Sequence, residues 1–286
     1  MDKSRTASIR RTKIAKSTAF YLGNIIIGVI FVSPLLWMIA ASFKPENDVF
    51  ANMTSILTFI PVNFTAGNYV EVFQRLNIPQ ILGNTFLYIG LTLVGDLIFG
   101  SMCGYALAKL KFRGRGLILT IIIALSSMPV EAILLPLYIE MTQLGWVNTL
   151  AGLVFPFMMN CFSIYMFYSN FLDVPDALRE AASLDGCGAF RTFVSVIMPI
   201  SKTTYATVFI LDFIARWNDS MWPFLVTTGA DKRTVQLAVQ SFFGTNPVHY
   251  GAIMAALTLA SLPMLAIYIF MQKYYVQGIA ATGIKG

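Results

Sequence analysis

Charged residues are scarce in this chain of 286 residues, and their scarcity excludes the commonest class of protein. Asp, Glu, Lys and Arg together make up 12% of the sequence, 57% of it is hydrophobic, and the mean hydropathy is +0.69. A soluble domain usually carries roughly 25% charged residues. The composition therefore excludes an ordinary soluble domain and predicts an all-α protein that crosses a membrane several times.

Residues that commonly bind metals or carry catalysis are also few. The chain has one histidine and three cysteines, and Cys103, Cys161 and Cys187 lie in or beside apolar stretches without the spacing of a metal site or a disulfide framework. We find no nucleophile–base pair either. The sequence predicts no enzyme, no metal site and no cofactor in this chain. The net charge of +6 does not indicate nucleic-acid binding, because the basic residues lie in short loops between apolar stretches.

Apolar stretches predict six transmembrane helices, at about residues 20–43, 83–108, 117–138, 151–171, 203–226 and 251–273. They form a membrane domain over residues 17–273, preceded by a basic N-terminus at 1–16 and followed by a tail at 274–286. The first stretch is too long for the apolar part of a signal peptide. A polar loop at 172–202 separates the fourth and fifth spans.

The distribution of basic residues predicts the orientation. Fifteen of the 20 lysines and arginines lie in the segments that share a side with the N-terminus, four lie in the opposite loops, and Arg216 lies within the fifth span. Because cytoplasmic loops are enriched in Lys and Arg, both termini and the loop at 172–202 are predicted to be cytoplasmic.

The loop at 172–202 is the most distinctive stretch, PDALREAASLDGCGAFRTFVSVIMP from Pro175 to Pro199. Asp173 is predicted to cap a short helix whose first turn holds Pro175. Gly186 and Gly188 are predicted to end that helix before a second short apolar run. A helix–turn–helix this short and polar is predicted to dock on another protein.

This stretch resembles the E-A-A-x-x-x-G motif of the membrane subunits of binding-protein-dependent ABC importers. Val196 and Met198 depart mildly from the family pattern. NYVEVF, WNDSMWPF and the tail ATGIKG are similar to the smaller membrane subunit of maltose-type carbohydrate transporters. The family's coupling residues are carried over to Glu180, Ala181, Ala182, Asp185, Gly186 and Pro199.

The resemblance implies the partners. We expect a second homologous permease subunit, two ATP-binding subunits that hold ATP and Mg²⁺, and an extracytoplasmic solute-binding protein that delivers a carbohydrate. The expected location is a bacterial or archaeal cytoplasmic membrane. The tail is expected to be flexible and to reach the ATPase interface through Thr282, Gly283 and Lys285; a merely solvated end is the alternative. Its sequence GIAATGIK lacks the spacing of a phosphate-binding loop, so the chain itself is not expected to hydrolyse ATP.

Ionisable residues within the predicted spans should face protein or water, because charges in lipid are costly. Asp212 and Arg216, four residues apart on one helical face, are predicted to form an ion pair. Asp96 could pair with Arg216 instead. Sugar hydroxyl groups and ring faces suit amides, carboxylates and aromatic rings, so the substrate-pathway candidates are Asn160, Asn218, Asp219 and Trp222. For Trp217 and Trp222, anchoring at the membrane interface is equally plausible.

The sequence thus favours a permease subunit of an ATP-driven sugar or oligosaccharide importer that works by alternating access. Two alternatives stay open. One is an ABC permease for a non-sugar solute. The other is a secondary transporter that uses Asp96, Glu131 and Asp212 as proton or ion sites. On the outer side, the turn at 145–148 and the loop at 227–250 are candidates for contact with a binding protein.

Overall fold

A computed structural model describes residues 3–283, and every regular element in this range is helical. Two compact units divide the chain. The first comprises residues up to Arg75 together with Phe242–Leu259, and the second comprises Leu76–Ser241 and the residues from Ala260 onward. Each unit is described by itself.

The first unit begins with α1 (Lys3–Ser42) and continues through η1 (Glu46–Asp48), η2 (Ile56–Phe59) and α2 (Gly67–Arg75). Asn68 Nδ2 donates to the carbonyl oxygens of Ser42 and Lys44 at 2.9 and 2.8 Å, satisfying acceptors at the end of α1 and just past it. Glu46 accepts hydrogen bonds from the backbone N–H groups of Tyr250 and Gly251, both at 2.9 Å, at the start of α15 (Tyr250–Gly283). These polar contacts hold the loops of this unit together.

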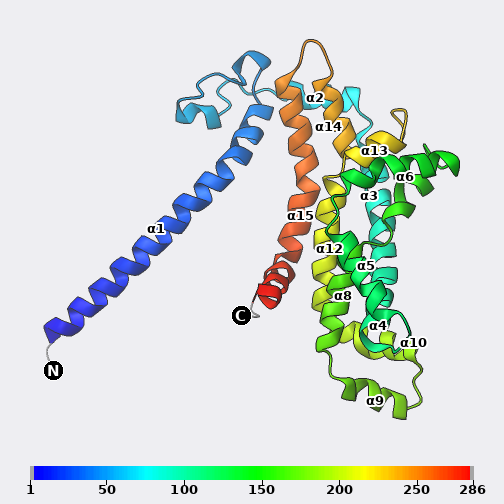
Figure 1. Cartoon of the computed structure of the whole chain (residues 1–286). Helices are drawn as coiled ribbons and strands as arrows, with labels where there is room; N and C mark the ends of the chain where they lie inside the picture. Colours follow the sequence, from blue (N-terminus) through cyan, green and yellow to red (C-terminus); the bar gives the residue numbers. More distant parts are fainter. Residues whose placement is uncertain (1–2, 284–286) are drawn as a thin grey trace. The chain divides into compact units, whose positions relative to one another are not determined.

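The second unit contains most of the helices. They are α3 (Ile78–Gly95), the π-helical turn η3 (Asp96–Gly100), α4 (Ser101–Lys109), α5 (Arg115–Ser126), α6 (Glu131–Gln143), α7 (Leu150–Val154), η4 (Phe155–Phe157), α8 (Cys161–Asp173), α9 (Asp176–Leu184), α10 (Ala189–Thr192), the π-helical turn η5 (Phe193–Ile197), α11 (Met198–Ile200), α12 (Lys202–Trp217), α13 (Met221–Val226) and α14 (Val235–Phe243), which runs to the boundary with the first unit. In Figure 1, α4, α5, α8 and α12 lie alongside one another. The short helices α9 and α10 lie at one end of this group, and α6 and α13 lie at the other.

Close packing of α4 against α8 forms the centre of this unit. A Cβ atom at Gly104 would lie 2.7 Å from Phe167 Cβ and 2.9 Å from the Tyr168 nitrogen, so only glycine allows the two helices to approach this closely. Tyr105, Phe171 and Phe193 are buried beside this contact. The small residue on α4 and the aromatic side chains around it make α4 and α8 a tightly packed pair.

Within residues 3–283, four helical stretches are long and apolar enough to cross a membrane: Lys16–Ser42, Ile78–Lys109, Leu150–Asp173 and Tyr250–Gln272. Two pairs of helices meet the same criteria only when each pair is counted as one bent span. α5 and α6 are bent by 106°, and Ala189–Ile200 and Lys202–Trp217 are bent by 79°. The chain is therefore a multi-pass membrane protein with four to six candidate spans.

Two predicted spans differ from the helices in the structure. The predicted third span at 117–138 is broken between Ser126 and Glu131, at the segment that contains Pro129, because a proline cannot continue the helical hydrogen-bond ladder. The predicted fifth span at 203–226 ends at Trp217, and α13 is a separate helix. The tail after residue 273 is helical as far as Gly283, and the flexibility expected of its last residues stays a prediction.

Candidate functional site

The short helix α9 lies in the cytoplasmic loop predicted by the sequence, but its start differs from the prediction. Pro175 occupies the N-cap position, without a side-chain cap, and Asp176 begins the helix. Asp173, predicted as the cap, is instead the last residue of α8. The carboxylate of Asp176 in the first turn favours this start because it faces the positive end of the helix dipole.

The end of α9 explains the glycine of the E-A-A motif. The backbone N–H of Cys187 donates to Ala182 O at 2.9 Å, and the N–H of Gly186 donates to Ser183 O at 3.1 Å. This pair of bonds is a Schellman motif, which requires a left-handed residue after the helix. Gly186 supplies it with φ = +79°. The glycine therefore ends the helix sharply and fixes the direction in which the chain leaves it.

The motif residues divide between packing and exposure. Ala182 is buried against the rest of the chain, whereas Glu180, Ala181, Asp185, Gly186 and Pro199 are exposed. Leu184 is 90% exposed and Phe190 is 66% exposed on the same loop. An apolar side chain this exposed at the end of a short helix gives the loop a surface that another protein can cover.

Lys109, which the sequence marked only as one of several basic residues after the second span, holds the start of α9. Its side chain is only 6% exposed. It donates to Val174 O at 2.7 Å and to Asp176 Oδ1 at 2.9 Å. No local pattern marks this contact, because the partners lie 65 and 67 residues further along the chain.

We expect Asp176 to titrate below the usual range of aspartate. The hydrogen bond from Lys109, together with its positive charge and those of Arg179 and Lys111, lowers the pKa of Asp176. A lowered folded-state pKa stabilises the fold above the unfolded value of about 3.9, and this stabilisation is lost as pH falls through the folded-state value. Carbon-13 NMR of the Asp176 carboxyl group should give a midpoint below 3.9 that rises in Lys109→Met. A wild-type midpoint at or above 3.9 would contradict this assignment.

A second group of polar residues surrounds Arg216, in the space between the packed helices of the second unit. Arg216 Nε lies 3.5 Å from Asp212 Oδ1, the partner predicted from the spacing. Arg216 Nη1 lies 3.4 Å from Asp219 Oδ2, which also accepts a hydrogen bond from the Tyr88 hydroxyl at 2.8 Å. The guanidinium group stacks over the Phe157 ring, 4.3 Å from its centroid. Two carboxylates, a phenol and an aromatic face thus fix one buried cation; Tyr88 was not anticipated from the sequence.

A cavity of about 310 Å³ opens beside this group. Three of the four predicted pathway residues, Asn218, Asp219 and Trp222, line it together with Glu131 and Arg216. The remaining lining residues are Val130, Leu134, Phe157, Ala215, Ser220 and Met221. Amide, carboxylate and guanidinium groups around a volume of this size can exchange hydrogen bonds with a polar ligand.

The side chains of the two tryptophans are buried within the second unit. Trp217 is 2% exposed and packs against Phe86 and Phe213. Trp222 is 1% exposed, and its Nε1 donates to Leu153 O at 3.2 Å. Neither ring offers an open face to a sugar or to lipid headgroups, since both are covered by neighbouring helices. Their contribution is to the packing that shapes the cavity.

Asn160 and Asp96 lie apart from the cavity lining and contact each other. The Asn160 backbone N–H donates to Asp96 Oδ1 at 2.7 Å, and the Asn160 side chain caps α8 by accepting from Phe162 N at 2.9 Å. Asp96 is fully buried. The alternative pairing of Asp96 with Arg216 is therefore not the contact that this carboxylate makes.

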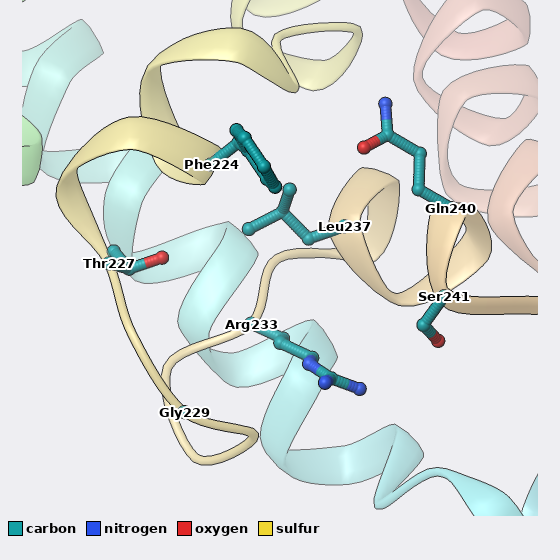
Figure 2. A pocket seen from close by; sticks show the side chains of 7 residues that line it. All are labelled: Phe224, Thr227, Gly229, Arg233, Leu237, Gln240 and Ser241. Carbon is teal, nitrogen blue, oxygen red and sulfur yellow. The ribbon is translucent and has the colours of Figure 1, made fainter. Parts of the chain in front are cut away.

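A second cavity, of about 410 Å³, lies between α13, the loop after it and α14 (Figure 2). Figure 2 shows the Phe224 and Leu237 side chains close together on one side, with Arg233 and Ser241 nearer the other. The remaining lining residues are Thr227, Gly229 and Gln240. This cavity belongs to the loop region predicted to lie outside the membrane.

The two outer loops considered for a binding protein are joined to each other. Asn148 N donates to Val226 O at 2.7 Å, and Thr228 N donates to Asn148 Oδ1 at 3.1 Å. Lys232 Nζ donates to Asn148 O. The turn at 145–148 and the beginning of the loop at 227–250 therefore form one hydrogen-bonded surface.

The predicted tail residues can be placed only in part. Thr282 and Gly283 lie in the last turn of α15, and Lys285 lies outside the described residues. Their contact with an ATPase stays a prediction.

Comparisons with known proteins agree with the geometry. Residues 96–281 match the family model described as "Binding-protein-dependent transport system inner membrane component". The trehalose/maltose transport system permease protein MalG of Thermococcus litoralis is 30% identical over 281 residues, covering 96% of this chain and 99% of the relative. The arabinooligosaccharides transport system permease protein AraQ of Halalkalibacterium halodurans is 28% identical, covering 97% and 99%.

A solved structure has the same fold. It is the crystal structure of a bacterial ABC transporter involved in the import of the acidic polysaccharide alginate. One of its chains aligns with a TM-score of 0.78 at 22% identity, covering 96% of this chain and 99% of that one. At 22% identity, this structural similarity shows a shared fold alone.

Proposed function

Because the chain belongs to the family of binding-protein-dependent transport system inner membrane components, we propose that it is a permease subunit of an ATP-driven importer for a sugar or oligosaccharide. Its relatives MalG and AraQ are named as permease proteins for trehalose/maltose and for arabinooligosaccharides. The proposed assembly contains a second permease, two ATP-binding subunits and an extracytoplasmic solute-binding protein, in a bacterial or archaeal cytoplasmic membrane. ATP would bind and be hydrolysed in the partner subunits.

We propose that each bent pair crosses the membrane once, which gives six spans with both termini cytoplasmic. The direction of two helices supports this topology. Asp96, before α4, contacts the start of α8, and Lys109, at the end of α4, contacts the residue after α8. The two helices therefore run in the same direction, as the second and fourth spans of a six-span protein must. The chain between them then crosses back once, through α5 and α6.

The observation that carries the proposal is the exposed end of α9. The E-A-A residues form a helix closed by a Schellman turn at Gly186, and Leu184 projects beside it with 90% of its surface exposed. A rigid, short helix with an apolar tip and the carboxylate of Glu180 fits a cleft with a basic rim. Closure of two ATP-binding subunits can then move the membrane helices as a rigid body. Differential affinity of ATP for the two states would supply the coupling free energy.

Cysteine crosslinking tests the docking directly. We would replace Cys103, Cys161 and Cys187 with serine and introduce Leu184→Cys in the assembled transporter. A short bifunctional maleimide should then link this chain to an ATP-binding subunit. Met221→Cys, which is also exposed but lies on α13 at the opposite end of the second unit, is the control and should give no such product. If Leu184→Cys crosslinks to no nucleotide-binding subunit, the docking role is wrong.

We further propose that the cavity beside Arg216 is part of the substrate pathway. Asn218 and Asp219 would exchange hydrogen bonds with sugar hydroxyl groups, with Glu131 on the facing helix. Trp222 is retained as a residue that shapes this cavity, and Asn160 as one that caps α8. Because the Trp222 ring is buried, we do not propose that it stacks on the sugar.

Replacing Asn218 with leucine should slow transport. One neutral hydrogen bond contributes about 0.5–1.5 kcal/mol, so the turnover at saturating binding protein should fall by roughly threefold to tenfold. The measurement is uptake into proteoliposomes of the sugar that the cognate binding protein retains in a ligand screen. Met221→Leu, an apolar exchange in the same cavity lining, is the control. An unchanged rate in Asn218→Leu would remove this residue from the pathway.

Two alternatives have their own tests. A secondary transporter would use Asp96, Glu131 and Asp212, but Asp96 bonds to Asn160 and Asp212 is paired with Arg216. Transport by the purified chain in liposomes without any ATPase would favour that reading. A permease for a non-sugar solute would instead be recognised by the ligand that its binding protein retains. A second permease gene and a solute-binding protein gene beside this one would favour the importer.

A further inference from the structure

Each end of α8 is held by a charged side chain from the second predicted span. At its start, Asp96 Oδ1 accepts the backbone N–H of Asn160, the N-cap residue, at 2.7 Å. At its end, Lys109 Nζ donates to the carbonyl of Val174, the C-cap residue, at 2.7 Å. The carboxylate faces the positive end of the helix dipole, and the ammonium group faces the negative end.

The spacing of the two charges matches the helix that they hold. Asp96 and Lys109 are 13 residues apart, and α8 itself has 13 residues. At about 1.5 Å per residue each segment is roughly 20 Å long. Both charged residues are removed from water, with Asp96 fully buried and the Lys109 side chain only 6% exposed. Between them, Gly104 lets α4 approach Phe167 to van der Waals contact.

Lys109 also connects this pair of helices to α9. The same ammonium group that bonds to Val174 bonds to Asp176 Oδ1 at 2.9 Å. Only Pro175 separates Val174 from the first residue of α9. The junction between α8 and α9 therefore does not depend on backbone stiffness alone, because a side chain from α4 holds both sides of it.

We propose that Asp96 and Lys109 are positioning residues that lock α8 to the second span, so that this two-helix unit moves with α9. The lock itself follows from the contacts within the chain. Its role in coupling rests on the proposed function, in which α9 is moved by an ATP-binding subunit. Without the lock, displacement of α9 would bend the junction at Pro175 instead of displacing α8.

Hydrogen exchange of the full transporter complex in nanodiscs tests the lock. A hydrogen bond to a charged group contributes about 1.5–3 kcal/mol. Local opening of the junction between α8 and α9 should therefore become at least tenfold more frequent in Lys109→Met. Amides at 172–178 should exchange correspondingly faster, and Lys109→Arg, which keeps the charge, should restore most of the protection. Lys111→Met, the same change at an exposed lysine two residues away, is the control. Unchanged exchange in Lys109→Met would overturn the lock.

Two milder variants keep the test informative if Lys109→Met does not assemble. Asp176→Asn removes only the link to α9, so amides of the first turn of α9 should exchange faster while those of α8 do not. Asp96→Asn should speed exchange at residues 160–164 and leave 172–178 protected. Fast exchange over the whole of α8 in either variant would overturn the assignment of separate roles to the two ends.

The coupling role is tested without knowledge of the sugar. Met221→Cys, in a background without the native cysteines, reports on the cavity by its labelling rate with a membrane-impermeant maleimide. ATP with orthovanadate should change this rate in the parent complex, and the change should be lost in Lys109→Met and recovered in Lys109→Arg. A full response in Lys109→Met would overturn the coupling role. A failed crosslink from Leu184→Cys in the parent would instead overturn the proposed function, with the exchange results unaffected.

Discussion

Replacing Gly186 with valine should abolish uptake by the transporter while leaving insertion into the membrane unchanged. The Schellman turn needs φ = +79° at this position, where a residue with a branched Cβ is strained by at least 1–2 kcal/mol. The strain is relieved if the helix end unwinds, and the surface formed by Ala181 and Leu184 is then no longer presented in one orientation. We expect uptake to fall by at least tenfold, with the rate of ATP hydrolysis no longer responding to loaded binding protein.

The neighbouring glycine provides the control. Gly188 has φ = −70°, an ordinary value for any residue, and no atom lies within 4 Å of the position that its Cβ would occupy. Gly186 has the same open surroundings, so an added Cβ meets no atom at either site, and the left-handed backbone is found only at Gly186 of the two. Gly188→Val should therefore transport at nearly the parental rate, and Gly186→Asn should retain part of the activity, because asparagine tolerates the left-handed region. Normal uptake in Gly186→Val would count heavily against the docking role of α9.

Replacing Arg216 with alanine should be the most destabilising single change in the second unit. The substitution leaves Asp212, which is buried, and Asp219 without their cation. Removing one partner of a buried ion pair costs about 3–5 kcal/mol, because the remaining charge stays out of water. The apparent melting temperature of the detergent-solubilised complex should fall by many degrees, and the yield of assembled transporter should fall with it.

Two further variants separate this explanation from a simple loss of packing. Arg75 makes the same i,i+4 pair with Glu71, but 38% of its side chain is exposed, so Arg75→Ala should cost no more than about 1 kcal/mol. Asp212→Asn combined with Arg216→Met removes the charge of Arg216 and of Asp212, the more deeply buried of its two partners, while keeping most of the volume, and it should recover much of the lost stability. If this double variant is as unstable as Arg216→Ala, the unpaired carboxylate of Asp212 is not the cause.

Local patterns in the sequence predicted the short helix in the loop at 172–202 well. Polar residues, two glycines and the E-A-A spacing were sufficient to locate a short helix that ends at Gly186, since a turn of this kind depends on residues within a few positions of each other. The i,i+4 spacing also brought Asp212 and Arg216 together. These features are set by the sequence near them, which is why they could be predicted.

Features set by distant contacts were missed. Lys109 and Tyr88 find their partners more than 60 residues away, and nothing in their own neighbourhoods marks them. The tryptophan rings were assigned to a ligand or to the membrane interface, but tertiary packing buries them. The spans at 117–138 and 203–226 were drawn as continuous because mean hydropathy over a window does not register a change of helix direction. A proline in an apolar run, such as Pro129, was the available signal for the first of these breaks.

The exposed tip of α9 has a consequence for how cells and laboratories must handle this subunit. Leu184 and Phe190 remain largely uncovered on the isolated chain. A copy made in excess of its partners therefore exposes an apolar patch that favours aggregation or degradation by quality-control proteases. We therefore expect this chain to be most stable when it is produced together with its partner subunits in matched amounts.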